Sequence, residues 1–270
     1  DPQLAHIATD GETYGHHQQY ADMGLAFCLN YIETNHLAEL TVYGQYLERF
    51  PPTYEVEIFE RTSWGCSHGV ERWRSNCGDN AGHPGWNQEW RRPLREAMDW
   101  LRDQMVPLFA RDLAPFVRDP WRARDDYIRV ILDRSKENVD RFLGEHANRP
   151  LTDAEKVKVL KLLGIQRMAM LMFTSCGWFF DEISGLETYQ VLQYAARAMQ
   201  MAREVGWGDL EPGYLKILAN AKSNIPEFEN GARIYDLFVR PAIIDLPRVA
   251  GHFAMISLFE RDGSPATIYS

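Results

Sequence analysis

Two short segments near the start of the chain have the hydrophobic patterns of β-strands. Residues 4–9 form an apolar run that ends at Asp10 and a glycine, as expected for a buried strand that leads into a loop. Residues 54–59 alternate glutamate with valine and isoleucine, which is the period-two pattern of a half-exposed strand. The pattern therefore predicts one or two strands in this part of the chain.

Most of the remaining chain has the periodicity of amphipathic helices. Met23, Phe27 and Tyr31 recur at four-residue steps, and a second short helix over residues 41–50 is stopped by Pro51. An apolar stripe at helical spacing predicts a helix over residues 90–105, and its members are Trp90, Leu94, Met98, Leu101 and Met105. Further helices are predicted over residues 121–134, 153–175, 187–204, 211–222 and 231–255. Thr152 and Asp153 before Glu155 resemble the capped start of the helix over residues 153–175. The predicted fold class is therefore mainly α.

A long connection over residues 60–86 is rich in Gly, Ser, Asn and Trp, and we call it the Trp-rich loop. Loops of this length inside compact domains are usually functional or mobile. The composition changes after it, so we expect a first part over residues 1–85, which includes the loop, and a helical domain over residues 86–270.

Composition and charge narrow the classes of partner. The chain has 270 residues and a net charge of −9, so it lacks the basic surface of a nucleic-acid-binding protein. No apolar stretch is long enough to cross a membrane, and four scattered cysteines do not make a disulfide scaffold. We expect a soluble, cytoplasmic protein with no cofactor. The start at Asp1, without an initiator Met or signal peptide, is interpreted as the cut end of a longer protein.

The stretch ATDGETYGHH concentrates titratable groups directly after the first predicted strand. Asp10 stands at the C-terminal end of that strand, where barrel enzymes keep catalytic groups. Glu12 is placed to tune the pKa of Asp10, and His16 and His17 can donate hydrogen bonds to sugar hydroxyls. The alternative is an Asx turn that caps the following helix, with both histidines at the surface.

The Trp-rich loop is a second candidate site. It contains Trp64 in the sequence TSWGCSHG, with Trp73 and Trp86 nearby. Exposed indole rings on a glycine-rich loop stack well against sugar rings, whereas the alternative is that these rings only anchor the loop.

The same loop contains enough ligands for a zinc site: Cys66, His68, Cys77 and His83. Four such ligands suffice for a closed tetrahedral site. Their spacing, C-x-H followed by C-x5-H, matches no common zinc motif. We therefore favour buried cysteines and polar loop histidines, and zinc binding stays an alternative.

A third segment, MFTSCGWFFDEISGLET, interrupts two helical patterns. Trp178 and two phenylalanines precede Asp181 and Glu182, a composition suited to an aromatic and carboxylate wall of a sugar cleft. The simpler interpretation, which we favour, is a helix end packed by aromatic side chains.

Taken in order, these segments resemble glycoside hydrolase family 57, which contains α-glucan-active amylases, branching enzymes and glucanotransferases. The family's D-x-E-x-[FY]-G-H-type motif is matched by Asp10, Glu12, Tyr14, Gly15 and His16. Its S-W-G loop with a downstream Trp resembles the passage from Trp64 to Trp73, and its S-D-W-x-F segment is similar to SCGWFF. The resemblance covers most of residues 5–205, and Gly177 departs from the aspartate that is usual there.

This resemblance implies that residues 1–85 hold the last strand or strands of an incomplete β/α barrel, followed by a helical bundle domain. It implies that Asp10 is the general acid/base of a retaining enzyme that acts on α-glucans or oligosaccharides. The implied substrate-binding residues are Glu12, His16, His17, Trp64, Trp73 and Trp178.

Retaining hydrolysis needs two carboxyl groups about 5–5.5 Å apart, and in this family the nucleophilic glutamate lies on an earlier strand. The spacing of Glu12, Glu60 and Glu182 gives no reason to assign that role to any of them. We therefore expect that an N-terminal barrel half with the nucleophile is missing and that the chain alone has little activity.

Two other functions stay open at this point. In a metal-dependent carbohydrate deacetylase, a chemistry found on related barrels, Asp10, His16 and His17 would bind a divalent ion. Alternatively, the helical domain is a non-catalytic scaffold or partner-binding module that the Trp-rich loop anchors.

Overall fold

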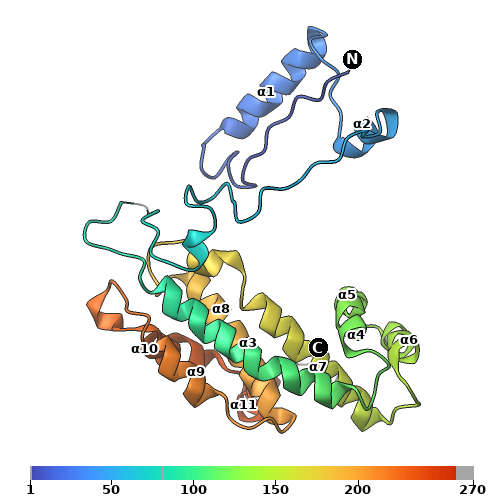
Figure 1. Ribbon diagram of the computed structural model, residues 1–270, viewed down its shortest axis with the longest axis vertical. Helices are drawn as coiled ribbons and strands as arrows, with labels where there is room; N and C mark the ends of the chain where they lie inside the picture. Colours follow the sequence, from blue (N-terminus) through green and yellow to red (C-terminus); the bar gives the residue numbers. More distant parts are fainter. Residues whose placement is uncertain (1, 81, 260–270) are drawn as a thin grey trace. The chain divides into compact units, whose positions relative to one another are not determined.

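The protein is described by a computed structural model of residues 2–80 and 82–259, and its regular structure is helical (Figure 1). The chain forms two compact units, Asp1–Glu60 and Arg61–Ser270. The prediction of a mainly α fold is confirmed. None of the helices in the described ranges combines the length and the apolar character that a membrane span requires.

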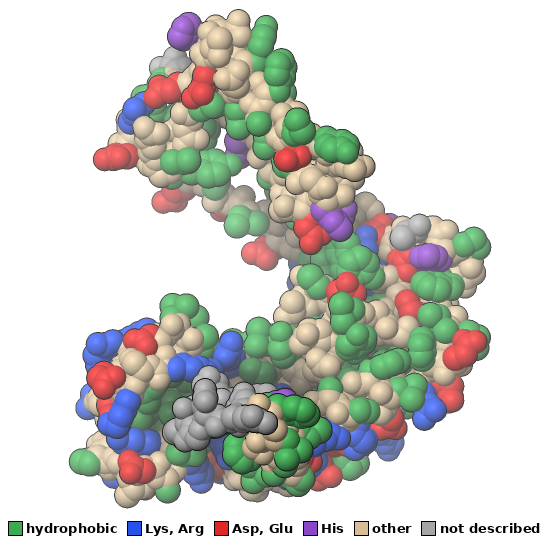
Figure 2. Space-filling view, turned by 180° about the vertical axis from the view of Figure 1, so that it is seen from behind, with side chains coloured by type: hydrophobic (Ala, Val, Ile, Leu, Met, Phe, Trp, Pro, Cys, Tyr) green, Lys and Arg blue, Asp and Glu red, His purple; other side chains and the backbone are tan. Residues whose placement is uncertain are grey.

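The first unit contains α1 (Ala21–Thr34) and α2 (Tyr43–Arg49), as the periodicity predicts. Neither helix buries a side chain, and Phe27, at the centre of the predicted apolar face, is 66% exposed. Hydrophobic side chains are accordingly visible at the surface of this unit (Figure 2). Both helices of this unit are therefore formed although none of their side chains is buried in a hydrophobic core within the described residues.

The two predicted strands are not formed in the described part of the chain. Residues 4–9 and 54–59 have no regular structure, and Val56 and Ile58 are 88% and 84% exposed. A strand exists only through hydrogen bonds to a neighbouring strand, and neither segment has such a neighbour among the described residues. The prediction that residues 1–85 contain strands of a β/α barrel is therefore wrong for the described residues.

The second unit is a helical bundle built on α3 (Arg91–Leu113), α7 (Asp153–Leu171) and α8 (Leu186–Glu204), which lie side by side (Figure 1). The helix α9 (Glu211–Leu218) packs against α3. The predicted stripe from Trp90 to Met105 faces the core, where each of its apolar members is at most 1% exposed. The helix predicted over residues 90–105 is therefore confirmed, because its periodic apolar residues lie on the face that is buried.

Several helix boundaries follow predicted local signals. The helix α7 begins at a capping box in which Thr152 and Glu155 bond reciprocally. It ends before a short 3-10 turn, η2 (Ser175–Trp178), so the predicted break at SCG is confirmed. A second 3-10 turn, η1 (Glu71–Trp73), lies in the Trp-rich loop.

Other boundaries differ from the prediction. One helix predicted over residues 121–134 is divided into α4 (Pro120–Asp126) and α5 (Ile128–Leu132), and α6 (Lys136–His146) was not predicted. The helix predicted over residues 231–255 is divided into α10 (Gly231–Ile234), the π-helix η4 (Tyr235–Val239), the 3-10 turn η5 (Arg240–Ala242) and α11 (Leu246–Ser257). Pro241 lacks the N–H that a continuous α-helix would need and lies in η5. Residues 243–245 are not helical, and Pro247 lies in the first turn of α11, where its missing N–H has no helical partner.

Candidate functional site

The predicted catalytic turn lies in the first unit and is exposed. The backbone N–H of Thr13 donates to the Asp10 carbonyl oxygen, and that of His17 to the Glu12 carbonyl oxygen, both at 3.0 Å. The side chains of Glu12 and His17 form an ion pair of 3.5 Å, and the His16 ring lies edge-on to His17 at 5.0 Å. The structure therefore gathers Glu12, His16 and His17 beside an exposed Asp10.

The alternative in which Asp10 caps the next helix is wrong. The helix α1 begins at Ala21 with Tyr20 in the N-cap position, and no side chain caps it. The Asp10 carboxylate is thus not used as a helix cap.

The three predicted sugar-binding tryptophans have different environments. Trp64 is 85% exposed, so its ring faces are available to a ligand. The indole of Trp73 is partly buried and donates to the carbonyl oxygen of Ser175 at 3.1 Å. Trp178 is 1% exposed and donates to the carbonyl oxygen of Arg91 at 3.1 Å. The prediction that Trp178 binds substrate is wrong, because its ring is part of the core.

The Trp-rich loop is attached to the segment that follows α7. The guanidinium group of Arg72 donates to the carbonyl oxygens of Gly65 at 2.9 Å and Phe179 at 2.7 Å. A Cβ atom at Gly65 would lie 3.5 Å from the Phe179 ring and 3.6 Å from the Trp73 ring, so the backbone approaches both rings closely. The second and third sequence candidates therefore form one surface.

A pocket of about 480 Å³ lies on this surface. Its lining comprises Arg72, Asn80, His83 and Trp86 from the loop, Phe179 to Glu182 and Gly185 after η2, and Glu187 in α8. The rings of His83 and Trp86 are stacked at 4.3 Å, and Phe180 is 50% exposed. The pocket thus combines aromatic faces with acidic and amide groups, whereas sequence reasoning favoured a purely structural role for the segment after α7.

Two acidic residues of this pocket have structural roles. Glu182 is 7% exposed, and its two oxygens accept bonds from Ser223 Oγ at 2.5 Å and the Asn224 N–H at 2.8 Å. The Asn224 side chain donates to the carbonyl oxygen of Asp181 at 3.1 Å. These hydrogen bonds fix the wall of the pocket, and both carboxylate oxygens of Glu182 are used in them.

The side chains of Cys66, His68, Cys77 and Asp79 form a compact cluster in the loop. One ligand atom of each lies within 4.8 Å of those of the others, and no other group of three or more such side chains is gathered in the described part of the chain. Asp79 thus takes the place that the sequence assigned to His83, which stacks on Trp86 instead. Asp10, His16 and His17 do not form a metal-binding group of this kind in the described residues.

The sequence contains a spacing pattern that points to Asp79 as a ligand. Cys66 and His68 are separated by one residue, as are Cys77 and Asp79. A ligand set restricted to cysteine and histidine leaves out Asp79, which forms a C-x-D pair with Cys77. The matched pair spacing was the feature that could have identified Asp79.

The side chains of the cluster are partly buried. Burial raises the pKa of the Cys66 thiol, which is 4% exposed, and the hydrogen bond from that thiol lowers the pKa of Asp79. Arg91, fully buried at the start of α3, donates through Nη1 to Cys77 Sγ at 3.6 Å, and burial lowers its pKa. Arg72 lies 3.8 Å from Asp79. Two arginines therefore lie beside the cluster, Arg72 near Asp79 and Arg91 near Cys77.

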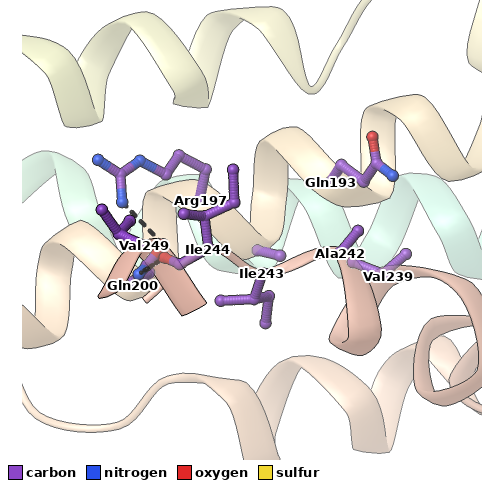
Figure 3. Close-up of a pocket in the computed structure, with 9 residues that line it drawn as sticks. Gln193, Arg197, Gln200, Val239, Ala242, Ile243, Ile244 and Val249 are labelled. Atoms are coloured by element: carbon purple, nitrogen blue, oxygen red, sulfur yellow. Dashed lines mark hydrogen bonds between the residues drawn. The ribbon is translucent and has the colours of Figure 1, made fainter. Parts of the chain in front are cut away.

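A second pocket, of about 400 Å³, lies between α8 and residues 239–249 (Figure 3). Apolar side chains such as Val239, Ile243 and Ile244 account for most of its lining. Arg197 donates to Gln200 at 2.7 Å, and Gln200 donates to the Ile244 carbonyl oxygen at 2.8 Å, so its polar groups bond one another. Its side chains offer no acid, base or nucleophile.

Comparison with known families identifies the region that follows the loop. The family described as "Domain of unknown function (DUF3536)" matches residues 86–270, well over half of the chain. The chain belongs to the DUF3536 family. No curated protein and no solved structure matches it.

The DUF3536 match includes α3 and the pocket wall from Phe179 to Glu187, but it begins after the cysteine cluster. Arg91 lies inside the matched region and contacts Cys77 outside it. The cluster therefore belongs to the same compact unit as the DUF3536 domain.

Proposed function

We propose that the protein is a carbohydrate-active enzyme of the glycoside hydrolase family 57 type, which acts on α-glucans with retention of configuration and uses Asp10 as general acid/base. The observation that most supports the binding of a carbohydrate is the pocket shared by the Trp-rich loop and the segment after η2. Both segments resemble parts of that family, and they are adjacent in space although more than 100 residues separate them, as Arg72 and Phe179 illustrate.

The lining of the pocket suits a sugar ring. A pyranose has apolar C–H faces that stack on aromatic rings, and Trp86 and Phe180 offer such rings. Its hydroxyl groups need donors and acceptors, which Asn80 and Glu187 provide at the same pocket. The volume of about 480 Å³ lies within the usual range for small-molecule sites.

The proposed role of Asp10 follows from retaining chemistry. Protonated Asp10 gives its proton to the glycosidic oxygen as that oxygen leaves, while a second carboxylate attacks the anomeric carbon. The Asp10 carboxylate then takes a proton from water as the water displaces the enzyme carboxylate, which restores both groups. The nucleophile is not assigned to a residue of this chain, since the oxygens of Glu182 are already hydrogen-bonded.

Binding is tested with maltoheptaose by calorimetry and by tryptophan fluorescence. We expect saturable binding and a loss of at least about tenfold in affinity for Trp86→Ala, because stacking on an aromatic ring contributes on the order of 1 kcal/mol or more. Trp121→Ala, in α4 and outside the pocket, is the matched control and keeps wild-type affinity. Equal affinity of the Trp86 variant and wild type would refute the sugar-binding pocket.

Catalysis is tested with maltooligosaccharides as substrate, by comparing the wild-type protein with variants. Asp10→Asn is expected to lower kcat by about 10²–10⁴, the usual contribution of a general acid or base. Asp22→Asn, an exposed carboxylate in the first turn of α1, is the control and leaves kcat unchanged. Wild-type turnover by the Asp10 variant would exclude the proposed role.

A further inference from the structure

The cysteine cluster of the Trp-rich loop has a function of its own. We propose that Cys66, His68, Cys77 and Asp79 bind one Zn²⁺ ion, which fastens the loop in its folded form beside the DUF3536 domain. This inference goes beyond the proposed carbohydrate function and stands whether or not that proposal is correct.

Two of the distances between the ligand atoms match those of a tetrahedral site. Zn–S bonds of about 2.3 Å at the tetrahedral angle separate two sulfurs by about 3.8 Å, and Zn–N and Zn–O bonds of about 2.1 Å separate those atoms by about 3.4 Å. The Cys66 and Cys77 sulfurs are 3.9 Å apart, and His68 Nδ1 and Asp79 Oδ1 are 3.5 Å apart. Since all four ligand atoms lie within 4.8 Å of one another, small side-chain rotations complete the coordination.

The loop backbone is folded so that it presents these ligands. Gly69 follows the first ligand pair with φ of +77°, and a Cβ atom there would collide with the Arg61 carbonyl oxygen. Gly78 separates the second pair with φ of +86°, a conformation that other residues rarely adopt.

The charges around the cluster fit a divalent cation. With zinc bound, both cysteines would be thiolates, so that they and the Asp79 carboxylate would supply three negative charges, of which Zn²⁺ would cancel two. The buried Oδ2 atom of Asp79 accepts no hydrogen bond in the described part of the chain, and Arg72 Nη2 lies 3.8 Å from it. Arg72 and the fully buried Arg91 lie beside Asp79 and Cys77, where their positive charges offset the remaining negative charge.

The donor set selects zinc among common divalent ions. Thiolate and imidazole ligands favour Zn²⁺, whereas Mg²⁺ and Ca²⁺ prefer oxygen ligands alone. Four protein ligands leave no coordination position for a substrate, so the site is structural rather than catalytic. Because Arg72 also bonds Phe179, an ion that orders residues 66–79 also orders one side of the pocket.

The first test uses the wild-type chain, purified in a thiol-reducing buffer and exposed to Zn²⁺ or Co²⁺ alone. We expect one tightly held Zn²⁺ per chain by elemental analysis. We expect the Co²⁺-loaded protein to show the thiolate-to-cobalt charge-transfer band and the intense visible bands of tetrahedral coordination. Neither measurement depends on enzymatic activity.

The ligands are tested one at a time. Cys77→Ser and His68→Ala are expected to lose the bound ion, and Asp79→Asn to lower Zn²⁺ affinity by at least about tenfold, as loss of a ligand bond requires. His83→Ala and Cys176→Ser are the matched controls, since both residues lie outside the cluster, and each variant keeps one ion.

Three results would overturn the site: less than about 0.1 equivalent of Zn²⁺ on the reduced wild-type chain, a Co²⁺ spectrum without thiolate bands, or equal loss of zinc in the His83 and His68 variants. Circular dichroism shows whether each variant retains its helices. If a variant fails to fold, the cobalt spectrum of the wild-type chain decides whether the metal site exists.

Discussion

Arg72 donates a 2.7 Å hydrogen bond to the carbonyl oxygen of Phe179, and its guanidinium carbon lies 4.5 Å from the centre of the Phe179 ring. The same guanidinium group donates to the carbonyl oxygen of Gly65 within the Trp-rich loop. One side chain thus connects the loop to the wall of the candidate pocket.

Arg72→Ala is expected to lower the free energy of unfolding of the second unit by about 1.5–3 kcal/mol, because a charged donor is removed from two partly buried carbonyl oxygens. Urea denaturation followed by tryptophan fluorescence measures the loss. Arg74→Ala removes only an exposed ion pair with Glu71 and should change stability by less than about 1 kcal/mol. Equal effects of the two substitutions would contradict this role of Arg72.

Gly177 packs against α8 with no room for a side chain. A Cβ atom there would lie 2.7 Å and 2.9 Å from the two methyl carbons of Val191. Gly177→Ala should therefore destabilise the protein by about 1–3 kcal/mol, and Gly177→Asp by more, since it also buries a charge. This contact accounts for glycine at a position where the resembled family usually has aspartate.

The matched control for Gly177 is Gly144→Ala. Gly144 lies inside α6, and a Cβ atom there meets nothing within 4 Å. This substitution should stabilise the protein by about 0.5–1 kcal/mol. Combining Gly177→Ala with Val191→Ala should recover part of the loss, and strict additivity of the two substitutions would argue against the steric explanation.

Amides of α1 should exchange hydrogen faster than those of α3 by at least about 100-fold. None of the residues of α1 is buried, whereas α3 has eight buried residues along its length. Hydrogen exchange followed by mass spectrometry measures the difference. Comparable protection of both helices would show that the helices of the first unit are stabilised by contacts other than those described.

Acid should destabilise the start of α7 through Glu155. The hydrogen bond from Arg149, with further bonds from Thr152, lowers the pKa of Glu155 from 4.5 to about 2. Because this pKa is lower in the folded state, the ionised carboxylate stabilises the fold above pH 4.5, and that contribution is lost as the pH falls towards 2.

Thermal unfolding of wild type and Glu155→Gln between about pH 2 and pH 6 tests this linkage. The wild-type protein should be the more stable of the two near pH 6, and the difference should shrink steadily towards pH 2. A difference that does not change with pH would contradict the assignment.

Helices whose apolar periodicity matches a buried face were predictable from the sequence. The stripe from Trp90 to Met105 and the capping box at Thr152 are local signals, and both are found as predicted. The short helix α6 was missed because eleven residues with few apolar positions give a weak periodic signal. The predicted strands failed for a different reason, since a strand needs a partner that no local pattern can supply.

The sequence by itself determined the mainly helical character, the break before Trp178 and the concentration of cysteines and histidines in the Trp-rich loop. Only the tertiary structure decided that Trp178 is buried, that Asp79 rather than His83 joins the cysteine cluster, and that the loop and the segment after η2 share a pocket. Helix periodicity and caps act over a few residues, so they are visible in the sequence. The other features depend on where a glycine-rich loop packs against residues far along the chain, and this is decided by side-chain packing and hydrogen bonds such as that from Arg72 to Phe179.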